Sequence, residues 1–344
     1  MKAFFKSYRL NFINPSGTSR GVLRQKKTYL IFIENENQIG IGEAALFEGL
    51  SYDDRPDYED KLQWVCEHIH LGKTQLLQET KEYPSIQFGL ETAFLSFQAS
   101  DRFEIFPSKF TSGQDNIKIN GLIWMGEKAF MKSQIEDKIQ RGFSCVKLKI
   151  GAINFDEELN LLKYIRQEFS ANDIELRVDA NGAFSPNDAL EKLSRLSDFD
   201  LHSIEQPIKQ GQWKEMAKLC KTTPLPIALD EELIGITNVT KRMEMLLTIQ
   251  PQHIILKPAL VGGLIESKKW IAMANELNIG SWITSALESN VGLNAIAQFT
   301  YTLNSKMPQG LGTGSLFSNN IESPLEVKGE FLSYDKTKTW GKIR

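Results

Sequence analysis

The clearest alternation of apolar and polar residues in the chain runs from residue 145 to residue 151. Three apolar residues there alternate with Lys147 and Lys149. Because successive side chains of a β-strand point to opposite faces, the pattern predicts a strand with both ammonium groups on one face. Two like charges side by side are commonplace on a solvated edge strand, so their meaning depends on the segments farther along the chain.

Short apolar runs recur after this strand, and each ends in a charged residue. The runs end at Asp179, Glu205, Asp230 and Lys257. They succeed one another about 25 to 30 residues apart, the spacing of a (β/α) barrel, whose functional groups lie at the C-terminal ends of its strands. The spacing predicts an α/β fold, a barrel of the TIM type, with these four residues at one mouth.

Between these strands, apolar residues recur at helical spacing, which predicts one helix in each unit. Further strands are predicted at 117–123 and 281–288, and the glycine-rich run Gly310–Gly314 lies where the eighth strand is expected to end. We interpret that run as a tight closing turn, with a phosphate cradle as the alternative. The predicted helices cover residues 126–141, 155–169, 186–196, 211–221, 237–249 and 264–277.

Residues 1–115 have a different pattern, with strands first and helices afterwards, which predicts a separate α+β capping domain. We expect the barrel to cover 116–318 and the tail 319–344 to pack back on the first domain. Polar loops at 14–20 and 48–56 are candidates for lids over the barrel mouth. The predicted strands are 4–11, 27–34 and 39–44, and the predicted helices are 57–71 and 86–98.

Composition narrows the class of protein. The chain has 344 residues, 41% of them hydrophobic, and a formal net charge of −3, so we expect neither a nucleic-acid nor a membrane partner. Three widely spaced cysteines fit reduced thiols, and there is no apolar run long enough for a signal peptide or a membrane span. We therefore expect a soluble, cytoplasmic protein, either a monomer or a homo-oligomer.

Three carboxylates delivered to one barrel mouth predict a metal site. Asp179, Glu205 and Asp230 would repel one another unless a cation lay between them. All-oxygen ligands favour Mg²⁺, with Mn²⁺ as a possible substitute. The four histidines do not fall at the strand ends, which argues against a zinc hydrolase.

The lysines suggest proton transfer beside that metal. Mg²⁺ bound to a substrate carboxylate makes it easier to remove the adjacent proton, and nearby cations favour the neutral, basic form of a lysine. Lys149, one step nearer the strand end, is the better base, and Lys147 the better modulator. Lys257 would approach from across the barrel, with a salt bridge to a barrel carboxylate as the structural alternative.

Five motifs together resemble the enolase superfamily, in particular its muconate-lactonizing subgroup, over almost the whole chain, capping domain included. The resemblance implies a lysine base and an Mg²⁺-stabilised enediolate, with Asp179, Glu205 and Asp230 as metal ligands. The motifs, in order and spacing, are Lys147-Leu-Lys149, Asp179-Ala-Asn181, Glu205-Gln-Pro207, Asp230-Glu231 and Lys257-Pro258.

Within the subgroup, the segments 256–263 and 283–293 and Arg177 resemble a dehydratase of menaquinone biosynthesis. This resemblance implies a hydro-lyase acting on a small hydroxy-cyclohexadiene carboxylate by syn dehydration. Lys149 would remove the α-proton and then help the hydroxyl leave as water, while Lys257 would stabilise the enediolate through a cation–π contact. Arg177 and Asn181 would support the site, and Thr284, Ser285 and Gly310 would line the succinyl end.

Two departures and three alternatives accompany this resemblance. Glu232 replaces a serine of the usual pattern, and strand alternation predicts that Glu231 points away from Asp230. A dipeptide epimerase or N-acylamino-acid racemase would use both Lys149 and Lys257 as bases. A barrel that binds metal or metabolite without turnover is a remoter alternative, and the flanking carboxylates disfavour Schiff-base aldolase chemistry.

Overall fold

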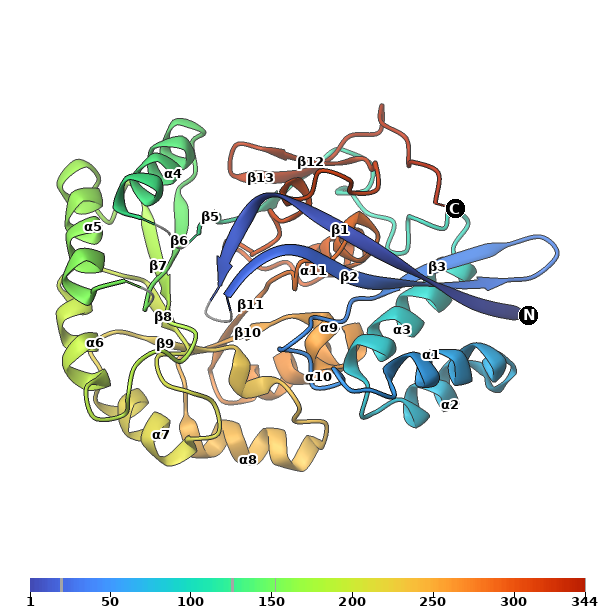
Figure 1. Cartoon of the computed structure of the whole chain (residues 1–344), viewed down its shortest axis with the longest axis horizontal. Coiled ribbons are helices and arrows are strands. Elements are labelled where there is room, and N and C mark those ends of the chain that lie inside the picture. Colours follow the sequence, from blue (N-terminus) through green and yellow to red (C-terminus); the bar gives the residue numbers. More distant parts are fainter. Residues whose placement is uncertain (19–20, 125–126, 152, 344) are drawn as a thin grey trace.

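The N-terminal part of the molecule is an antiparallel sheet packed on helices (Figure 1). The computed structural model describes residues 1–18, 21–124, 127–151 and 153–343. The sheet has the order β1-β2-β3, and a Cβ added to Gly42 in β3 would lie 2.0 Å from the carbonyl oxygen of Gly89 in α3. Sheet and helix backbones are therefore in direct contact. The elements are β1 (Lys2–Thr18), β2 (Gly21–Glu34), β3 (Ile39–Ala44), α1 (Tyr58–Glu67), η1 (Ile69–Leu71), α2 (Gly72–Glu79) and α3 (Pro84–Gln98).

The prediction of a polar loop at 14–20 is wrong for most of that range. β1 continues to Thr18 and β2 begins at Gly21, with Ser16 paired to Leu23 after a register shift; Ser19 and Arg20 lie outside the described residues. Polar residues can continue a hairpin whose far end is exposed, because strand pairing uses backbone groups. The helix expected at 57–71 ends earlier, at Glu67, and a short separate helix, α2, comes after it.

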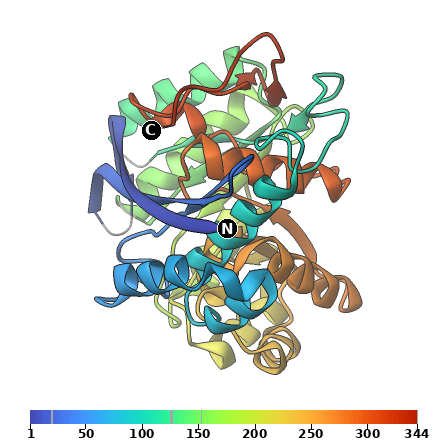
Figure 2. The ribbon, with the colours of Figure 1, turned by 90° about the vertical axis from the view of Figure 1, so that its right-hand side faces the viewer.

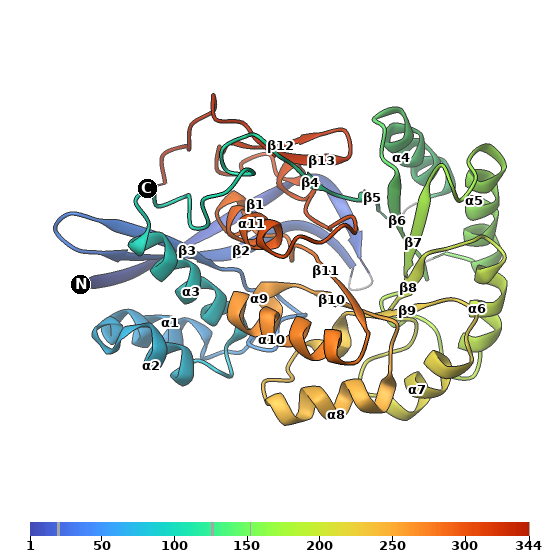
Figure 3. The ribbon, with the colours of Figure 1, turned by 180° about the vertical axis from the view of Figure 1, so that it is seen from behind.

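Most of the remaining chain forms the predicted barrel, with helices outside the strands (Figure 1, Figure 3). Seven strands pair in parallel in chain order. They are β5 (Gly121–Ile123), β6 (Cys145–Lys149), β7 (Glu175–Asp179), β8 (Ser203–Glu205), β9 (Ile227–Leu229), β10 (His253–Leu256) and β11 (Gly280–Ile283). The helices are α4 (Lys128–Gln140), α5 (Phe155–Glu168), α6 (Ala189–Ser197), α7 (Trp213–Thr222), α8 (Val239–Ile249), α9 (Pro258–Val261), α10 (Gly263–Glu276) and α11 (Asn290–Thr302), with short turns η2 (Glu231–Leu233) and η3 (Gly314–Leu316).

Two residues close the ring. Gln309 makes a parallel bridge to Ile119 just before β5, and Gly310 makes one to Thr284 just after β11. These residues occupy the eighth strand position that the sequence predicted. Among the helices predicted for the barrel, only that at 126–141 begins outside the described residues, at Gly126. Helix α11 was not predicted.

The end of the chain lies against both parts of the molecule. β12 (Leu325–Lys328) and β13 (Phe331–Tyr334) form a small sheet with β4 (Ile117–Lys118). Farther on, the ring of Trp340 stacks on Phe103 at 4.0 Å between centroids. At its other end the tail meets β1, where Phe317 bridges to Phe12 and the Ser318 amide donates to the Asn11 carbonyl at 2.9 Å. The domain limits at 115 and 318 stay predictions.

Two buried carboxylates of the N-terminal part fix it to the barrel. Glu91 in α3 accepts hydrogen bonds from the Leu264 and Ile265 amides at the start of α10. Glu43 in β3 accepts from the Ser289 and Gly292 amides at the start of α11. Helix N-termini carry partial positive charge and unpaired amides, so both contacts are favourable. Figure 2 shows the N-terminal sheet and helices from their own side, in front of the barrel. None of the helices in the described ranges combines the length and apolar character needed to span a bilayer.

Candidate active site

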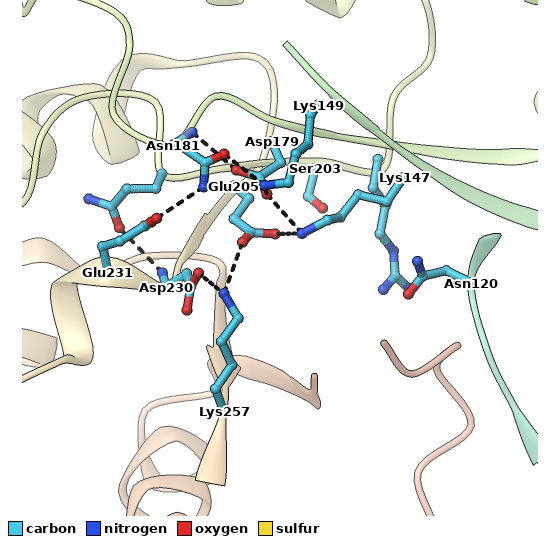
Figure 4. Close-up of polar contacts among 12 residues, drawn as sticks. Asn120, Lys147, Lys149, Asp179, Asn181, Ser203, Glu205, Asp230, Glu231 and Lys257 are labelled. Atoms are coloured by element: carbon cyan, nitrogen blue, oxygen red, sulfur yellow. Dashed lines mark hydrogen bonds and ion pairs between the residues drawn. The ribbon is translucent and has the colours of Figure 1, made fainter. Parts of the chain in front are cut away.

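The charged strand ends meet at one mouth of the barrel, as Figure 4 shows. Lys149, Asp179 and Glu205 are the last residues of β6, β7 and β8, and they are direct register partners across these strands. Asp230 and Lys257 come directly after the ends of β9 and β10. Parallel strands present their C-terminal ends at the same edge, which is why residues distant in the chain become neighbours.

The lysine and carboxylate groups form one buried network. Lys147 Nζ donates to Asp179 Oδ2 at 2.9 Å and to Glu205 Oε2 at 2.5 Å. Lys149 Nζ donates to the same Asp179 oxygen at 2.9 Å. Lys257 bonds Asp230, and its Nζ lies 4.0 Å from Glu205 Oε1. The salt bridge foreseen as the alternative for Lys257 is thus present, together with its position at the mouth.

Burial and neighbouring charge act in opposite directions on these groups. Burial favours the neutral form of Lys147, but Asp179 and Glu205 outweigh it and hold the Lys147 pKa well above its ordinary value. The same balance, with Asp230 as the main partner, raises the pKa of Lys257. Burial and the nearby charge of Asp179 raise the pKa of Glu205 to about 8. The attraction of Lys147 and Lys257 therefore does not offset the burial of Glu205 and its repulsion by Asp179.

The donor set fits a hard divalent cation. Asp179, Glu205 and Asp230 offer only oxygen, and Glu205 Oε1 is buried without a hydrogen-bond partner within the described part of the chain. As arranged, however, no three His, Cys, Asp or Glu side chains among the described residues are clustered tightly enough to hold a metal. The lysine ammonium groups lie between the carboxylates, so a metal would require them to move aside.

Asn181 and Glu231 also lie at the barrel mouth, and Glu231 points in a direction that differs from the prediction. Asn181 accepts from Lys149 Nζ at 2.7 Å and donates to Glu231 Oε1 at 3.0 Å. Glu231 was expected to point away from Asp230, but both face the network (Figure 4). The strand ends at Leu229 and the chain turns into η2, so strand alternation no longer applies there.

The extra carboxylate Glu232 has a structural position. Its oxygens accept from the side-chain amide of Gln206 at 3.1 Å and from the Gly211 amide at 2.8 Å. Glu232 therefore ties the turn η2 to the loop after β8, and it points away from the lysine network.

A cavity of about 240 Å³ opens beside the network. Of the residues predicted for the substrate side, Asn181, Thr284, Ser285 and Gly310 line it. Sequence reasoning missed several apolar lining residues, although one of them, Leu50, lies within the polar loop proposed as a lid. The missed residues include Phe47, Ile119, Trp124, Leu287 and Leu316.

Arg177, predicted to support the site, lies one layer deeper in the barrel than Asp179. Its guanidinium donates to the Pro308 carbonyl at 3.0 Å and to Glu175, and it lies over the ring of Trp282 at 4.5 Å. Arg177 lies two positions before Asp179 along β7, with one residue between them, so both point inward, but at different depths. Arg177 supports the barrel interior and is not part of the described cavity lining.

Comparison with known proteins agrees with this geometry. Residues 131–336 match the family model described as enolase C-terminal domain-like. The o-succinylbenzoate synthase of Desulfotalea psychrophila is 46% identical over 363 residues, covering 96% of this chain and 98% of that protein.

Solved structures agree as well. The crystal structure of MenC from Desulfotalea psychrophila superposes with a TM-score of 0.87 at 43% identity, covering 97% of this chain and 99% of that one. A substrate-liganded L-Ala-D/L-Glu epimerase from Bacillus subtilis shares the fold, with a TM-score of 0.84 at 18% identity and coverage of 99% and 97%.

Proposed function

The chain belongs to the enolase superfamily, and we propose on this basis that it is an o-succinylbenzoate synthase, a hydro-lyase of menaquinone biosynthesis. The observation that carries the proposal is the 46% identity to a protein of that name over nearly the whole length of both chains. The lysine and carboxylate network at the barrel mouth supports it. The substrate would be a hydroxy-cyclohexadiene carboxylate that carries a succinyl group.

Members of the superfamily use Mg²⁺, and in this chain Asp179, Glu205 and Asp230 would hold it. When bound, the ion supplies positive charge beside the substrate carboxylate, where negative charge develops as the neighbouring proton leaves. Glu231, hydrogen-bonded to Asn181, would remain beside these ligands as a neighbouring carboxylate.

Lys149 would carry out both proton transfers. With Asp179 engaged elsewhere, its amine is left with Asn181 as its partner and faces the cavity. Lys149 Nζ takes the proton α to the carboxylate, and the C–H electron pair moves into the substrate. The ring C–O bond then breaks, and Lys149 returns the proton to the departing hydroxide as water. One residue on one face suffices because the elimination is syn.

Lys257 would act on the opposite face of the ring. β6 and β10 are separated by three strands in the barrel order, so the two lysines approach the substrate from different sides. A protonated Lys257 would stabilise negative charge without removing a proton. Thr284, Ser285 and Gly310 would face the succinyl group.

A second function is favoured by the same two lysines. Bases on opposite faces are what a dipeptide epimerase or N-acylamino-acid racemase needs, and an L-Ala-D/L-Glu epimerase shares the fold. In that case Lys149 and Lys257 would each exchange the α-proton of one enantiomer.

A turnover assay separates the two functions. Purified protein with Mg²⁺ is mixed with the cyclohexadiene precursor, with an EDTA-treated sample as control, and aromatic product is followed by absorbance. Metal-dependent turnover with kcat/KM above roughly 10⁴ M⁻¹s⁻¹ is expected for a working dehydratase. Absence of turnover, together with solvent exchange of the α-proton in dipeptides or N-succinylamino acids, would replace dehydration by racemisation.

A further inference from the structure

One buried glutamine joins the loops on either side of strand β8. Gln206 follows Glu205 directly, is 0% exposed and has a left-handed backbone, with φ of 40°. Its backbone carbonyl accepts from the Gly182 amide at 2.6 Å, and Gly182 comes directly after Asn181 in the loop that follows β7. A left-handed backbone is uncommon for glutamine, so the surrounding contacts have to hold it.

The side-chain amide of Gln206 makes four hydrogen bonds, which is the most that an amide can make. Nε2 donates to the Ile208 carbonyl at 3.0 Å and to Glu232 Oε2 at 3.1 Å. Oε1 accepts from the backbone amides of Asp230 and Glu232, each at 3.3 Å. Both partners of Nε2 are acceptors and both partners of Oε1 are donors, so the amide has one favourable orientation.

The contacts of Oε1 account for the turn that follows β9. In a continuing strand, the N–H bonds of residues 230 and 232 would be parallel and about 7 Å apart, too far for one oxygen to accept both. The chain curls instead, because Asp230 has φ of −122° and ψ of −75°, outside the strand region, and η2 begins at Glu231. Alternation therefore ends at this point, and the carboxylates of Asp230 and Glu231 both face the network (Figure 4).

We propose that Gln206 is a positioning residue for the divalent cation, because it turns the chain after β9 and so brings the carboxylates of Asp230 and Glu231 to the barrel mouth. Gln206 is not among the described residues that line the cavity, and it acts through the backbone of residues 230–232. Asn181 donates to Glu231 Oε1 at 3.0 Å, so the loops after β7 and β9 are joined twice. The inference rests on the metal site of the proposed function and not on the identity of the substrate.

The test measures metal binding without substrate. Mn²⁺ is titrated into purified protein and followed by electron paramagnetic resonance, with Mg²⁺ as competitor. Gln206→Asn is one methylene shorter, so its oxygen cannot reach the two amides, while asparagine suits the left-handed backbone. Gln206→Leu removes the acceptor without restoring that backbone preference. Gln298→Asn is the matched control, because Gln298 is equally buried and makes three side-chain hydrogen bonds within α11 and to residues 103–106.

We expect Gln206→Asn and Gln206→Leu to weaken Mn²⁺ binding about 10- to 100-fold, and Gln298→Asn to change it less than about threefold. Unchanged affinity in Gln206→Asn would overturn the inference, and so would equal weakening in Gln298→Asn. If Gln206→Leu does not fold, Gln206→Asn decides alone. A wild type that binds Mn²⁺ but turns over neither substrate class removes the proposed reactions and leaves the inference standing, whereas a wild type that binds no Mn²⁺ removes the metal site and the inference together.

Discussion

Lys149 and Asn181 are joined by a 2.7 Å hydrogen bond from Nζ to Oδ1. Asn181 has a left-handed backbone, with φ of 45°, and this turn directs its side chain back toward β6. The proposed base is thus held by a residue whose backbone conformation is itself unusual for a non-glycine residue.

Replacing the base should remove the chemistry and leave the metal site. We expect Lys149→Ala to lower kcat by 10³-fold or more, since general base catalysis alone contributes roughly 10² to 10⁴. Mg²⁺ affinity, measured by calorimetry, should stay within a few-fold of wild type because Lys149 is not a ligand. Wild-type turnover in this variant would contradict the assignment.

Removing the support of the base should have a smaller effect. Asn181→Gly keeps the left-handed backbone accessible and deletes the amide, so Lys149 loses its neutral partner. We expect kcat to fall about 10- to 100-fold while the midpoint of urea unfolding shifts little. A variant with unchanged kcat would show that Asn181 does not hold the base.

The three proposed metal ligands can be separated from their acidic neighbours. Asp230→Asn and Glu205→Gln should each abolish measurable Mg²⁺ binding at millimolar metal. Glu232→Gln is the control, because Glu232 contacts Gln206 and the Gly211 amide and not the network. Binding of Mn²⁺ followed by electron paramagnetic resonance provides the readout. Loss of binding in Glu231→Gln with retention in Asp230→Asn would exchange the roles of these two residues.

The contact between β3 and α3 should tolerate no side chain at Gly42. A Cβ there would lie 2.0 Å from the Gly89 carbonyl oxygen and 2.5 Å from the Ala93 nitrogen, so the sheet and the helix would have to separate. We expect Gly42→Ala to lower the free energy of unfolding by about 2 to 4 kcal/mol. Gly312→Ala is a milder comparison, since its nearest neighbour is the flexible tip of Ile119 at 3.3 Å.

Acid should weaken the fold through His253. Burial, aided by the nearby charges of His202 and Arg177, lowers the pKa of His253 to about 4. Between about pH 6.5 and pH 4 the unfolded chain therefore binds more protons than the folded one, and stability falls as pH falls through this window. Over this pH range, the free energy of unfolding of His253→Gln should fall by about 2 kcal/mol less than that of the wild type. Exposed His70→Gln is the control, and urea unfolding at several pH values is the measurement.

The strand order of the barrel and the identity of the charged strand ends could be predicted from spacing alone. Each unit repeats an apolar run, a charged residue and a helix, and parallel pairing brings all the ends together. The prediction for Glu231 was wrong because alternation holds only inside a strand, and the chain turns directly after Leu229. The prediction of a loop at 14–20 was wrong because polar composition does not reveal whether backbone groups are paired.

Residues that reach the cavity from elsewhere in the chain gave no local signal. Phe47 follows β3 of the N-terminal sheet, and it joins Ser285 in the cavity lining only when that part docks on the barrel. Two adjacent lysines in the polar first half of β2 are typical of a solvated face, so only the packed structure shows that Lys26 is buried.

The pairing of Phe12 with Phe317, and of Ile119 with Gln309, also has a consequence for biosynthesis. The long hairpin is translated well before the residues that cover its edge strand β1 and close the ring. Until then, the emerging chain exposes an apolar hairpin and an open parallel sheet, the kinds of surface that aggregate or recruit chaperones. The segment 309–317 therefore decides when the nascent protein is protected from misassembly.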